Sequence, residues 1–180
     1  QVRANVSKKL GATEKVENGW YYLQNIGVGV NLTANLTGPS ITGMPQQKND
    51  YSQLWYLTNV NGRYTIKNAL NERYIIGVSG ASQNYQTGST QSTFAFNSTG
   101  DEYAPSFYIK DQSGVVMNIN GGSKIALSWY EEDPASKWYL VPAKVDETKL
   151  SEKRGNASEL KTISSYGSKY NEVLDKFFND

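Results

Sequence analysis

Between residues 17 and 142 the chain alternates hydrophobic and polar positions over short stretches. A period of two places successive side chains on opposite faces of a β-strand. Turn signals rich in glycine and asparagine, such as Asn61-Gly62 and Gly121-Gly122, separate these stretches. The residues that share one face in the two clearest stretches are Tyr21, Leu23 and Asn25, and then Tyr64, Ile66 and Asn68. The pattern therefore predicts an all-β domain of short strands and tight turns.

A triplet of a large aromatic residue, a tyrosine and a branched aliphatic residue occurs three times in this region. Its copies are Trp55-Tyr56-Leu57, Phe107-Tyr108-Ile109 and Trp138-Tyr139-Leu140. A second repeated stretch opens each unit with a glycine, and these glycines are Gly19, Gly62 and Gly114. Threefold self-similarity in a chain of 180 residues predicts a pseudo-threefold β fold.

The three units are placed at about residues 17–61, 62–113 and 114–143. Because their opening glycines are 43 and 52 residues apart, we expect the second unit to carry a long insertion within residues 79–104. Alternation points the outer residues of each triplet inward. The six residues expected to form the structural core are therefore Trp55, Leu57, Phe107, Ile109, Trp138 and Leu140.

Both flanks of the repeats differ from them in composition. Residues 1–16 are polar and predict an N-terminal arm, whereas residues 144–155 are charged and predict a linker or the start of a helix. Apolar residues then recur at helical spacing, at Leu160, Ile163, Tyr166, Tyr170, Val173, Leu174 and Phe177. We expect residues 144–180 to form a linker and a C-terminal amphipathic helix that docks on the β domain or on a neighbouring domain or protein.

Two absences from the composition limit the chemistry. The chain contains no histidine and no cysteine, which excludes Ser-His-Asp and Cys-His catalysis, disulfides and nearly every zinc site. The net charge of +1 comes from scattered charges of both signs, so a general nucleic-acid-binding face is not indicated. No apolar run approaches the ~20 residues of a membrane span. We expect no cofactor and no metal, and, because the chain begins at Gln1, a signal peptide that has been removed.

Three units of about four strands, each with an aromatic anchor, resemble the β-trefoil and, more narrowly, the ricin-B-type lectin family. Repeats of that family close on a Gln-X-Trp signature, which stands here as Gln53-Leu54-Trp55. The second and third units have Pro105-Ser106-Phe107 and Ser136-Lys137-Trp138 instead. The resemblance covers about residues 17–142 and implies a β-trefoil whose closing aromatics fill a shared core and whose glutamine braces the fold.

The same resemblance implies carbohydrate binding. Sugar-binding repeats of the family carry an aspartate shortly after the second strand, with an aromatic platform and an asparagine or glutamine farther along. At the corresponding places this chain has Thr33-Ala34, Gly77-Val78 and Leu127-Ser128. The family's sugar-site aspartate is therefore unmatched in all three units.

A dense group of aromatic and acidic residues, Trp129-Tyr130-Glu131-Glu132-Asp133, precedes a proline-marked turn in the third unit. Sugar sites need a flat apolar face for C–H groups and fixed polar groups for hydroxyls. Trp129 is not one of the repeating anchors, so one interpretation is a stacking platform with Tyr130, beside carboxylates from Glu131 and Asp133. The alternative is a hairpin with one buried aromatic and a solvated acidic tip.

The second candidate lies in the expected insertion, where amides flank a tyrosine in Gln83-Asn84-Tyr85-Gln86. Asn84 and Tyr85 are the residues that would contact a ligand there. In the alternative interpretation the tyrosine only holds its own loop in place.

These observations predict a non-catalytic, lectin-like carbohydrate-binding module of a secreted or cell-surface protein, with glycan or polysaccharide as partner. A glycosidase would need two opposed carboxylates, which carboxylates adjacent in sequence on one hairpin tip rarely provide. The alternative function is a protein–protein interaction trefoil that has lost sugar binding, an alternative that the missing aspartates favour.

Overall fold

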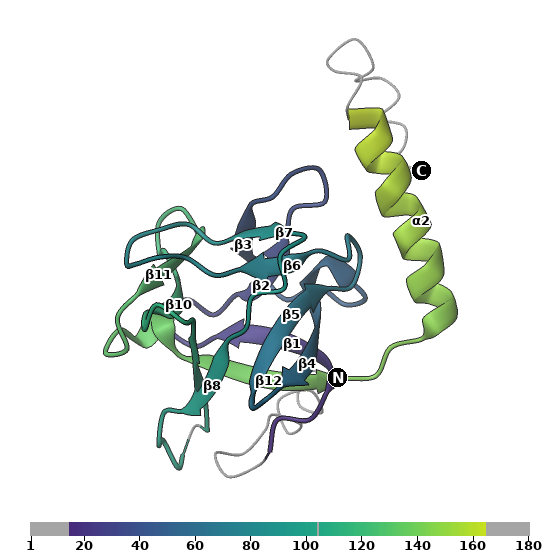
Figure 1. Cartoon of the computed structure of the whole chain (residues 1–180). Coiled ribbons are helices and arrows are strands. Elements are labelled where there is room, and N and C mark those ends of the chain that lie inside the picture. Colours follow the sequence, from purple (N-terminus) through teal and green to yellow (C-terminus); the bar gives the residue numbers. More distant parts are fainter. Residues whose placement is uncertain (1–14, 104, 165–180) are drawn as a thin grey trace.

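The structure is a computed structural model that describes residues 15–103 and 105–164, with the backbone alone for residues 160–164. The first fourteen residues of the predicted N-terminal arm, and the predicted helical residues from 165 onward, lie outside the described residues. Short strands make up nearly all of the regular structure before residue 144 (Figure 1). This agrees with the alternation of hydrophobic and polar positions, which is the pattern of half-buried strands.

The strands of the first third of the domain are β1 (Gly19–Asn25), β2 (Asn31–Ala34), β3 (Ile41–Met44) and β4 (Leu54–Val60). Those of the second third are β5 (Arg63–Asn68), β6 (Tyr74–Ile76), β7 (Gln86–Gly88) and β8 (Ala95–Ser98). Those of the last third are β9 (Phe107–Lys110), β10 (Val116–Ile119), β11 (Ala126–Trp129) and β12 (Trp138–Ala143). Two short 3₁₀ helices, η1 (Tyr51–Gln53) and η2 (Pro134–Ser136), precede β4 and β12, and the helix α2 (Glu147–Ser164) follows β12.

Six of the strands form a closed barrel. β1 pairs with β12 and β4, and β4 pairs with β5. A bridge between Tyr64 and Phe94 joins β5 to the residue just before β8, β8 pairs with β9, and Trp138 pairs with Phe107 to join β12 to β9. The ring of neighbours is therefore β1, β4, β5, β8, β9 and β12, and it returns to β1, so the barrel has no free edge.

The other six strands form three hairpins, β2–β3, β6–β7 and β10–β11. Single bridges link each hairpin to the other two, and they join Ser40 to Gln86, Thr42 to Ile125, and Asn84 to Leu127. A six-stranded barrel capped by three mutually bridged hairpins is the β-trefoil. The predicted fold class, an all-β trefoil with a C-terminal helix, is confirmed.

The strand pairing corrects the predicted boundaries of the repeats. Phe107 lies in β9, which opens the third repeat, whereas β8, preceded by Phe94, closes the second. The matching positions of the three opening strands are then Tyr21, Tyr64 and Phe107, evenly spaced at 43 residues. The expected units 62–113 and 114–143 are therefore wrong, and the second repeat carries no long insertion.

Hydrogen bonds from the tryptophans support this corrected alignment. The Trp55 indole donates to the Leu32 carbonyl oxygen at 2.9 Å, and the Trp138 indole donates to that of Met117 at 2.8 Å. Each bond joins the closing strand to the second strand of its own repeat. The side chain of Phe94, at the closing position of the second repeat, has no N–H to donate.

The barrel and the hairpins enclose one core. Its largest fully buried side chains include Trp55 and Trp138, and Phe107 is 3% exposed. The remaining residues expected in the core, Leu57, Ile109 and Leu140, are also buried.

The helix α2 begins at Glu147, inside the charged stretch for which a linker or a helix start was predicted. Leu150, which is 1% exposed, packs into a second apolar cluster that includes Tyr51, Leu54 and Ala69 of the β domain. Burial of one leucine contributes about 1.5–3 kcal/mol. Arg154 donates from Nε to the Ala69 carbonyl oxygen at 2.7 Å, so the described part of the helix is attached to the trefoil.

Candidate functional site

The aromatic and acidic group of the third repeat lies at the end of β11 and in the turn that follows it. Trp129 is the last residue of β11, half-buried, and the adjacent Tyr130 is 52% exposed. Their ring centroids are 5.3 Å apart, with the planes inclined at 58°. The two rings therefore form an angled, partly exposed aromatic ridge.

A lysine from another strand completes this group. Lys110, the last residue of β9, places Nζ 2.8 Å from Oε1 of Glu131. Lys110 pairs with Val116, and Val116 pairs with Trp129. Directly paired residues on neighbouring strands share a face of the sheet, so the lysine and the tryptophan lie on the same side. Sequence reasoning missed Lys110, because only the strand register brings it to Glu131.

The other two acidic residues have different surroundings. Asp133 caps η2, and its Oδ1 accepts a hydrogen bond from the Ala135 amide at 2.9 Å. That bond occupies one of the carboxylate oxygens that the sequence suggested for ligand contact. Glu132 is exposed. The structure thus brings Trp129, Tyr130 and Glu131 together and gives Asp133 a structural role beside them.

Hydrogen bonds from buried residues fix the backbone of the ridge. Ser136 donates from Oγ to the Tyr130 carbonyl oxygen at 2.7 Å, and it accepts from the Asn118 amide at 2.9 Å. Ser136 and Asn118 are both buried. A buried, satisfied polar pair of this kind fixes the geometry of the residues above it.

In the second candidate group, the tyrosine does not lie at the surface as predicted. Tyr85 is fully buried, and its hydroxyl donates to Oδ2 of Asp111 at 3.2 Å. Burial and the nearby Asp111 carboxylate raise the pKa of the Tyr85 phenol far above its usual value. The prediction that Tyr85 contacts a ligand is therefore wrong. Asn84 is exposed beside it, and its role stays a prediction.

Tyr85 is buried because its position faces the centre of the three hairpins. The corresponding residues of the first and third repeats are Ile41 and Ala126, and all three are 0% exposed. One large, one medium and one small side chain together fill this layer, as close packing requires. Alternation could have signalled burial, but the polar neighbours and the glycines of this stretch resemble those of a loop.

The corrected boundaries of the repeats also change which residues of this chain correspond to the family's sugar-site aspartate. The register makes Ile76-Gly77 and Asn118-Ile119 the counterparts of Thr33-Ala34. The third-repeat positions predicted from the sequence, Leu127-Ser128, lie on β11 instead. None of the corrected counterparts is an aspartate.

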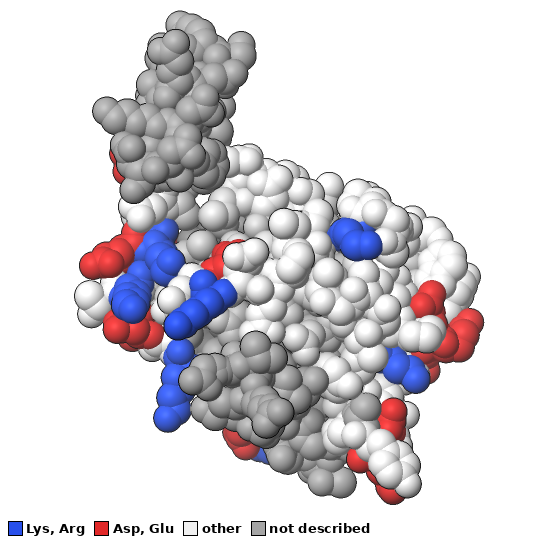
Figure 2. Space-filling view, turned by 180° about the vertical axis from the view of Figure 1, so that it is seen from behind, with Lys and Arg blue, Asp and Glu red and all other residues white. Residues whose placement is uncertain are grey.

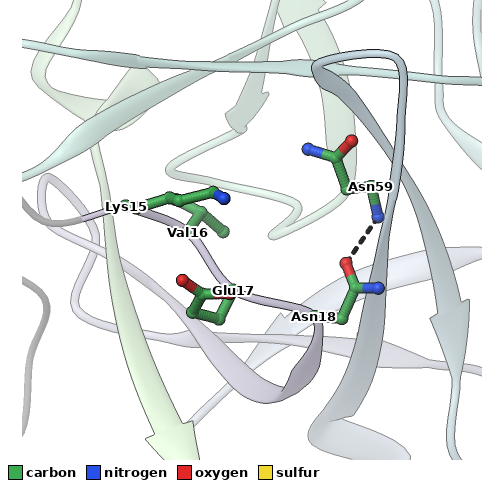
Figure 3. Close-up of a pocket in the computed structure, with 5 residues that line it drawn as sticks. All are labelled: Lys15, Val16, Glu17, Asn18 and Asn59. Atoms are coloured by element: carbon green, nitrogen blue, oxygen red, sulfur yellow. Dashed lines mark hydrogen bonds between the residues drawn. The ribbon is translucent and has the colours of Figure 1, made fainter.

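A cavity of about 350 Å³ lies where the chain enters the barrel, and Figure 3 shows its lining residues, Lys15, Val16, Glu17, Asn18 and Asn59. The side-chain oxygen of Asn18 accepts from the Asn59 amide at 2.7 Å, and the Tyr64 hydroxyl donates to the Val16 carbonyl oxygen at 2.7 Å. These bonds show a segment fastened to the barrel. Among the residues that the structure describes, no aromatic side chain lines this cavity.

A second cavity of about 250 Å³ lies between α2 and the β domain. Its lining residues are Leu36, Asn49, Asp50, Tyr51, Leu70, Lys153, Asn156 and Ala157. The Lys153 ammonium lies 5.1 Å from the centroid of the Tyr51 ring, and Asp50 caps η1 by accepting from the Ser52 amide. Polar groups at this junction thus serve contacts within the protein.

On the face shown in Figure 2, most charged side chains gather on the left and at the lower right, one basic side chain lies apart from them, and the white surface between them is uncharged. In the part of the chain that the structure describes, no three acidic side chains come together in a group able to hold a metal ion. Within residues 15–103 and 105–164, no helix is long and apolar enough to cross a membrane.

Comparisons with known proteins identify the fold. No family model matches the sequence, and no curated protein matches it either. Among solved structures, the Rhizoctonia solani agglutinin is similar, with a TM-score of 0.63 and 18% identity over 73% of this chain and 100% of its own. A ricin B-like lectin of Macrolepiota procera, in complex with lactose, gives a TM-score of 0.59 and 19% identity over 72% of this chain and 100% of its own.

A third similar structure belongs to an enzyme. The endo-β-galactosidase from Clostridium perfringens that releases GlcNAcα1-4Gal has a TM-score of 0.59 and 13% identity. The match covers 71% of this chain and only 33% of that protein. The chain is thus a β-trefoil, similar in fold to these two lectins and to a part of this larger enzyme chain.

Proposed function

We propose that this chain is a non-catalytic carbohydrate-binding module of a secreted or cell-surface protein, and that it binds glycan at the third repeat. The observation that carries the proposal is the ridge of Trp129 and Tyr130 with the Lys110–Glu131 pair at its side. Similar folds solved as lectins support it.

The ridge offers what a sugar ring requires. The C–H face of a pyranose packs on an aromatic ring, and Tyr130 is exposed enough to supply one. Lys110 donates and Glu131 accepts hydrogen bonds, so hydroxyl groups beside the ring find partners of both kinds. Asn118 and Ser136 hold the site from beneath, which lowers the entropic cost of binding.

A second function, a protein–protein interaction trefoil without sugar binding, is favoured by one observation. Thr33, Ile76 and Asn118 stand at the places where an aspartate would serve a sugar. Contact with a neighbouring domain or protein through the C-terminal helix stays a prediction, since the described part of α2 packs on the trefoil.

A glycan array tests the proposal, with the wild-type chain, Trp129→Ala and Tyr103→Ala compared side by side. Tyr103 is the matched control, because it is a fully exposed aromatic outside the ridge. We expect glycan binding that is lost in Trp129→Ala and kept in Tyr103→Ala. Binding that survives in Trp129→Ala would contradict this location of the site. A folded wild-type chain that binds no glycan would contradict the function and favour protein interaction.

A further inference from the structure

The Lys110–Glu131 pair is placed to decide which glycans the proposed third-repeat site accepts. Nζ and Oε1 are 2.8 Å apart, and the two side chains are 35% and 46% exposed. Glu131 follows the ridge residue Tyr130 in sequence, and Lys110 lies on the Trp129 side of the sheet. A ligand on the ridge would therefore meet both charges together.

Each member of the pair cancels the charge of the other. A lone lysine beside an aromatic platform would attract the carboxylate of an acidic sugar. With Glu131 in contact, an incoming carboxylate meets a like charge next to the ammonium, and like charges at this distance repel. The pair thus removes the electrostatic advantage of an acidic ligand.

The pair nevertheless keeps its hydrogen-bonding capacity. An ammonium has three donors and a carboxylate about four acceptor positions, and the contact between Lys110 and Glu131 uses one of each. Two neighbouring hydroxyl groups of a sugar can bind the remaining donors and acceptors: one accepts a hydrogen bond from the lysine and the other donates one to the glutamate.

From this geometry, and on the basis of the proposed function, we infer that the Lys110–Glu131 pair restricts the third-repeat site to uncharged saccharides that present neighbouring hydroxyl groups. Glu131 is the specificity-determining residue, because it both accepts a hydrogen bond from a sugar hydroxyl and repels the carboxylate of an acidic sugar. Lys110 contributes a donor whose charge is already neutralised.

The test is an array of neutral glycans and of glycans bearing uronic or sialic acid, applied to the wild-type chain, Glu131→Gln and Glu132→Gln. Glutamine keeps the shape of the side chain and removes its charge, and Glu132 is an exposed neighbour outside the pair. We expect the wild type to bind neutral glycans alone. Glu131→Gln should gain about tenfold in binding to acidic glycans, as expected for a hydrogen bond to a charged group, and lose this gain at high salt. Glu132→Gln should keep the wild-type profile.

The inference and the proposed function fail in different ways. If neutral glycans bind, Trp129→Ala abolishes binding and Glu131→Gln keeps the wild-type profile, the inference is overturned and the proposed function stands. If the wild type already binds acidic glycans as well as neutral ones, the inference is also overturned. If the folded wild type binds no glycan, or if Trp129→Ala binds as the wild type does, the proposed site itself is overturned.

Discussion

The second and third repeats each contain a two-stranded hairpin, β6–β7 and β10–β11, but they differ in the side chain at one matching position. In the third repeat, Trp129 pairs with Val116 and presents an indole. In the second, Gly88 stands at that position and pairs with Tyr74. A Cβ on Gly88 would come within 2.2 Å of Cδ1 of Ile76, so the isoleucine fills the space above the glycine. The backbone is thus alike in the two hairpins, and the side chain at this position decides whether an aromatic platform is present: an indole in the third repeat and none in the second.

The three repeats also differ in the polar residue at or just after the end of the opening strand, which is Asn25, Asn68 or Asp111. Asn25 and Asn68 donate, at 2.7 and 2.9 Å, to the backbone of the 3₁₀ helix that precedes the closing strand of the neighbouring repeat. At the matching position, Asp111 accepts from the Val78 amide and the Tyr85 hydroxyl of the second repeat. The core therefore holds a polar pair shared between two repeats, Tyr85 of the second and Asp111 of the third, whereas the Lys110–Glu131 pair lies within the third repeat and is partly exposed.

The largest expected effect distinguishes the buried Trp138 of the third repeat from the half-buried Trp129. Trp138→Ala should lower the free energy of unfolding by about 3–5 kcal/mol, because it empties a fully buried site and removes the bond to Met117. Urea unfolding measures the change, with Trp129→Ala as the matched control. An equal loss in both variants would contradict the division into core and platform.

The buried pair of Tyr85 and Asp111, shared between the second and third repeats, gives the next effect. Tyr85→Phe should lower the free energy of unfolding by about 1–2 kcal/mol, since it takes a hydrogen-bond donor from the buried Asp111 carboxylate. Denaturant titration at neutral pH measures it. A variant as stable as the wild type would show that the bond adds no net stability.

The same tyrosine predicts a dependence on alkaline pH. Burial and the Asp111 charge raise the pKa of Tyr85 above its usual value of 10.0, so its contribution is complete below pH 10 and is lost as the pH rises beyond that value. Stability measured from pH 8 to 11 should fall more steeply in the wild type than in Tyr85→Phe. Equal slopes would contradict a phenol that is held neutral in the folded state.

Filling the platform position of the second repeat should have a smaller cost. Gly88→Ala should destabilise the fold by about 1 kcal/mol through crowding of Ile76. The same substitution in an Ile76→Ala background should cost less, because the end of the isoleucine is gone. A double-mutant cycle measures this coupling, and additive effects would show that Ile76 does not occupy the space.

The smallest expected change in stability is at the platform itself. Trp129→Ala should cost under about 1 kcal/mol of unfolding free energy, as for a partly exposed side chain, while the affinity for a glycan falls at least about tenfold, as for an aromatic anchor. Titration calorimetry with a glycan found on the array measures the affinity. A large loss of stability would show that the indole is mainly a core residue.

Much of the fold could be predicted from local pattern. Alternation predicted the strands, and the repeated triplets predicted three related units. The repeats were misaligned because an aromatic–tyrosine–aliphatic triplet suits any barrel strand with an inward face, so Phe107-Tyr108-Ile109 matched the closing triplets although it opens a repeat. The true closing stretch, Phe94-Ala95-Phe96, lacks the tyrosine and therefore does not match the triplet pattern.

The candidate site could be predicted in part. Trp129, Tyr130 and Glu131 are adjacent in sequence, and Trp129 stands out because it is not a repeating anchor. Asp133 looked equivalent to Glu131, but the proline after it favours a capped turn, and the structure uses the carboxylate there. Tyr85 looked like a loop residue, and only the arrangement of the three hairpins shows that it faces their shared centre.

By itself, the sequence determined the alternation, the threefold repetition, the absence of histidine and cysteine, and the adjacency of two aromatic residues and an acid, because these are properties of residue order and residue type. Tertiary structure alone decided the register of the repeats, the burial of Tyr85 and the meeting of Lys110 with Glu131, 21 residues apart. Those outcomes depend on which strands pair. Strand pairing is set by closure of the barrel and packing of the whole core, and no local stretch of the chain contains that information.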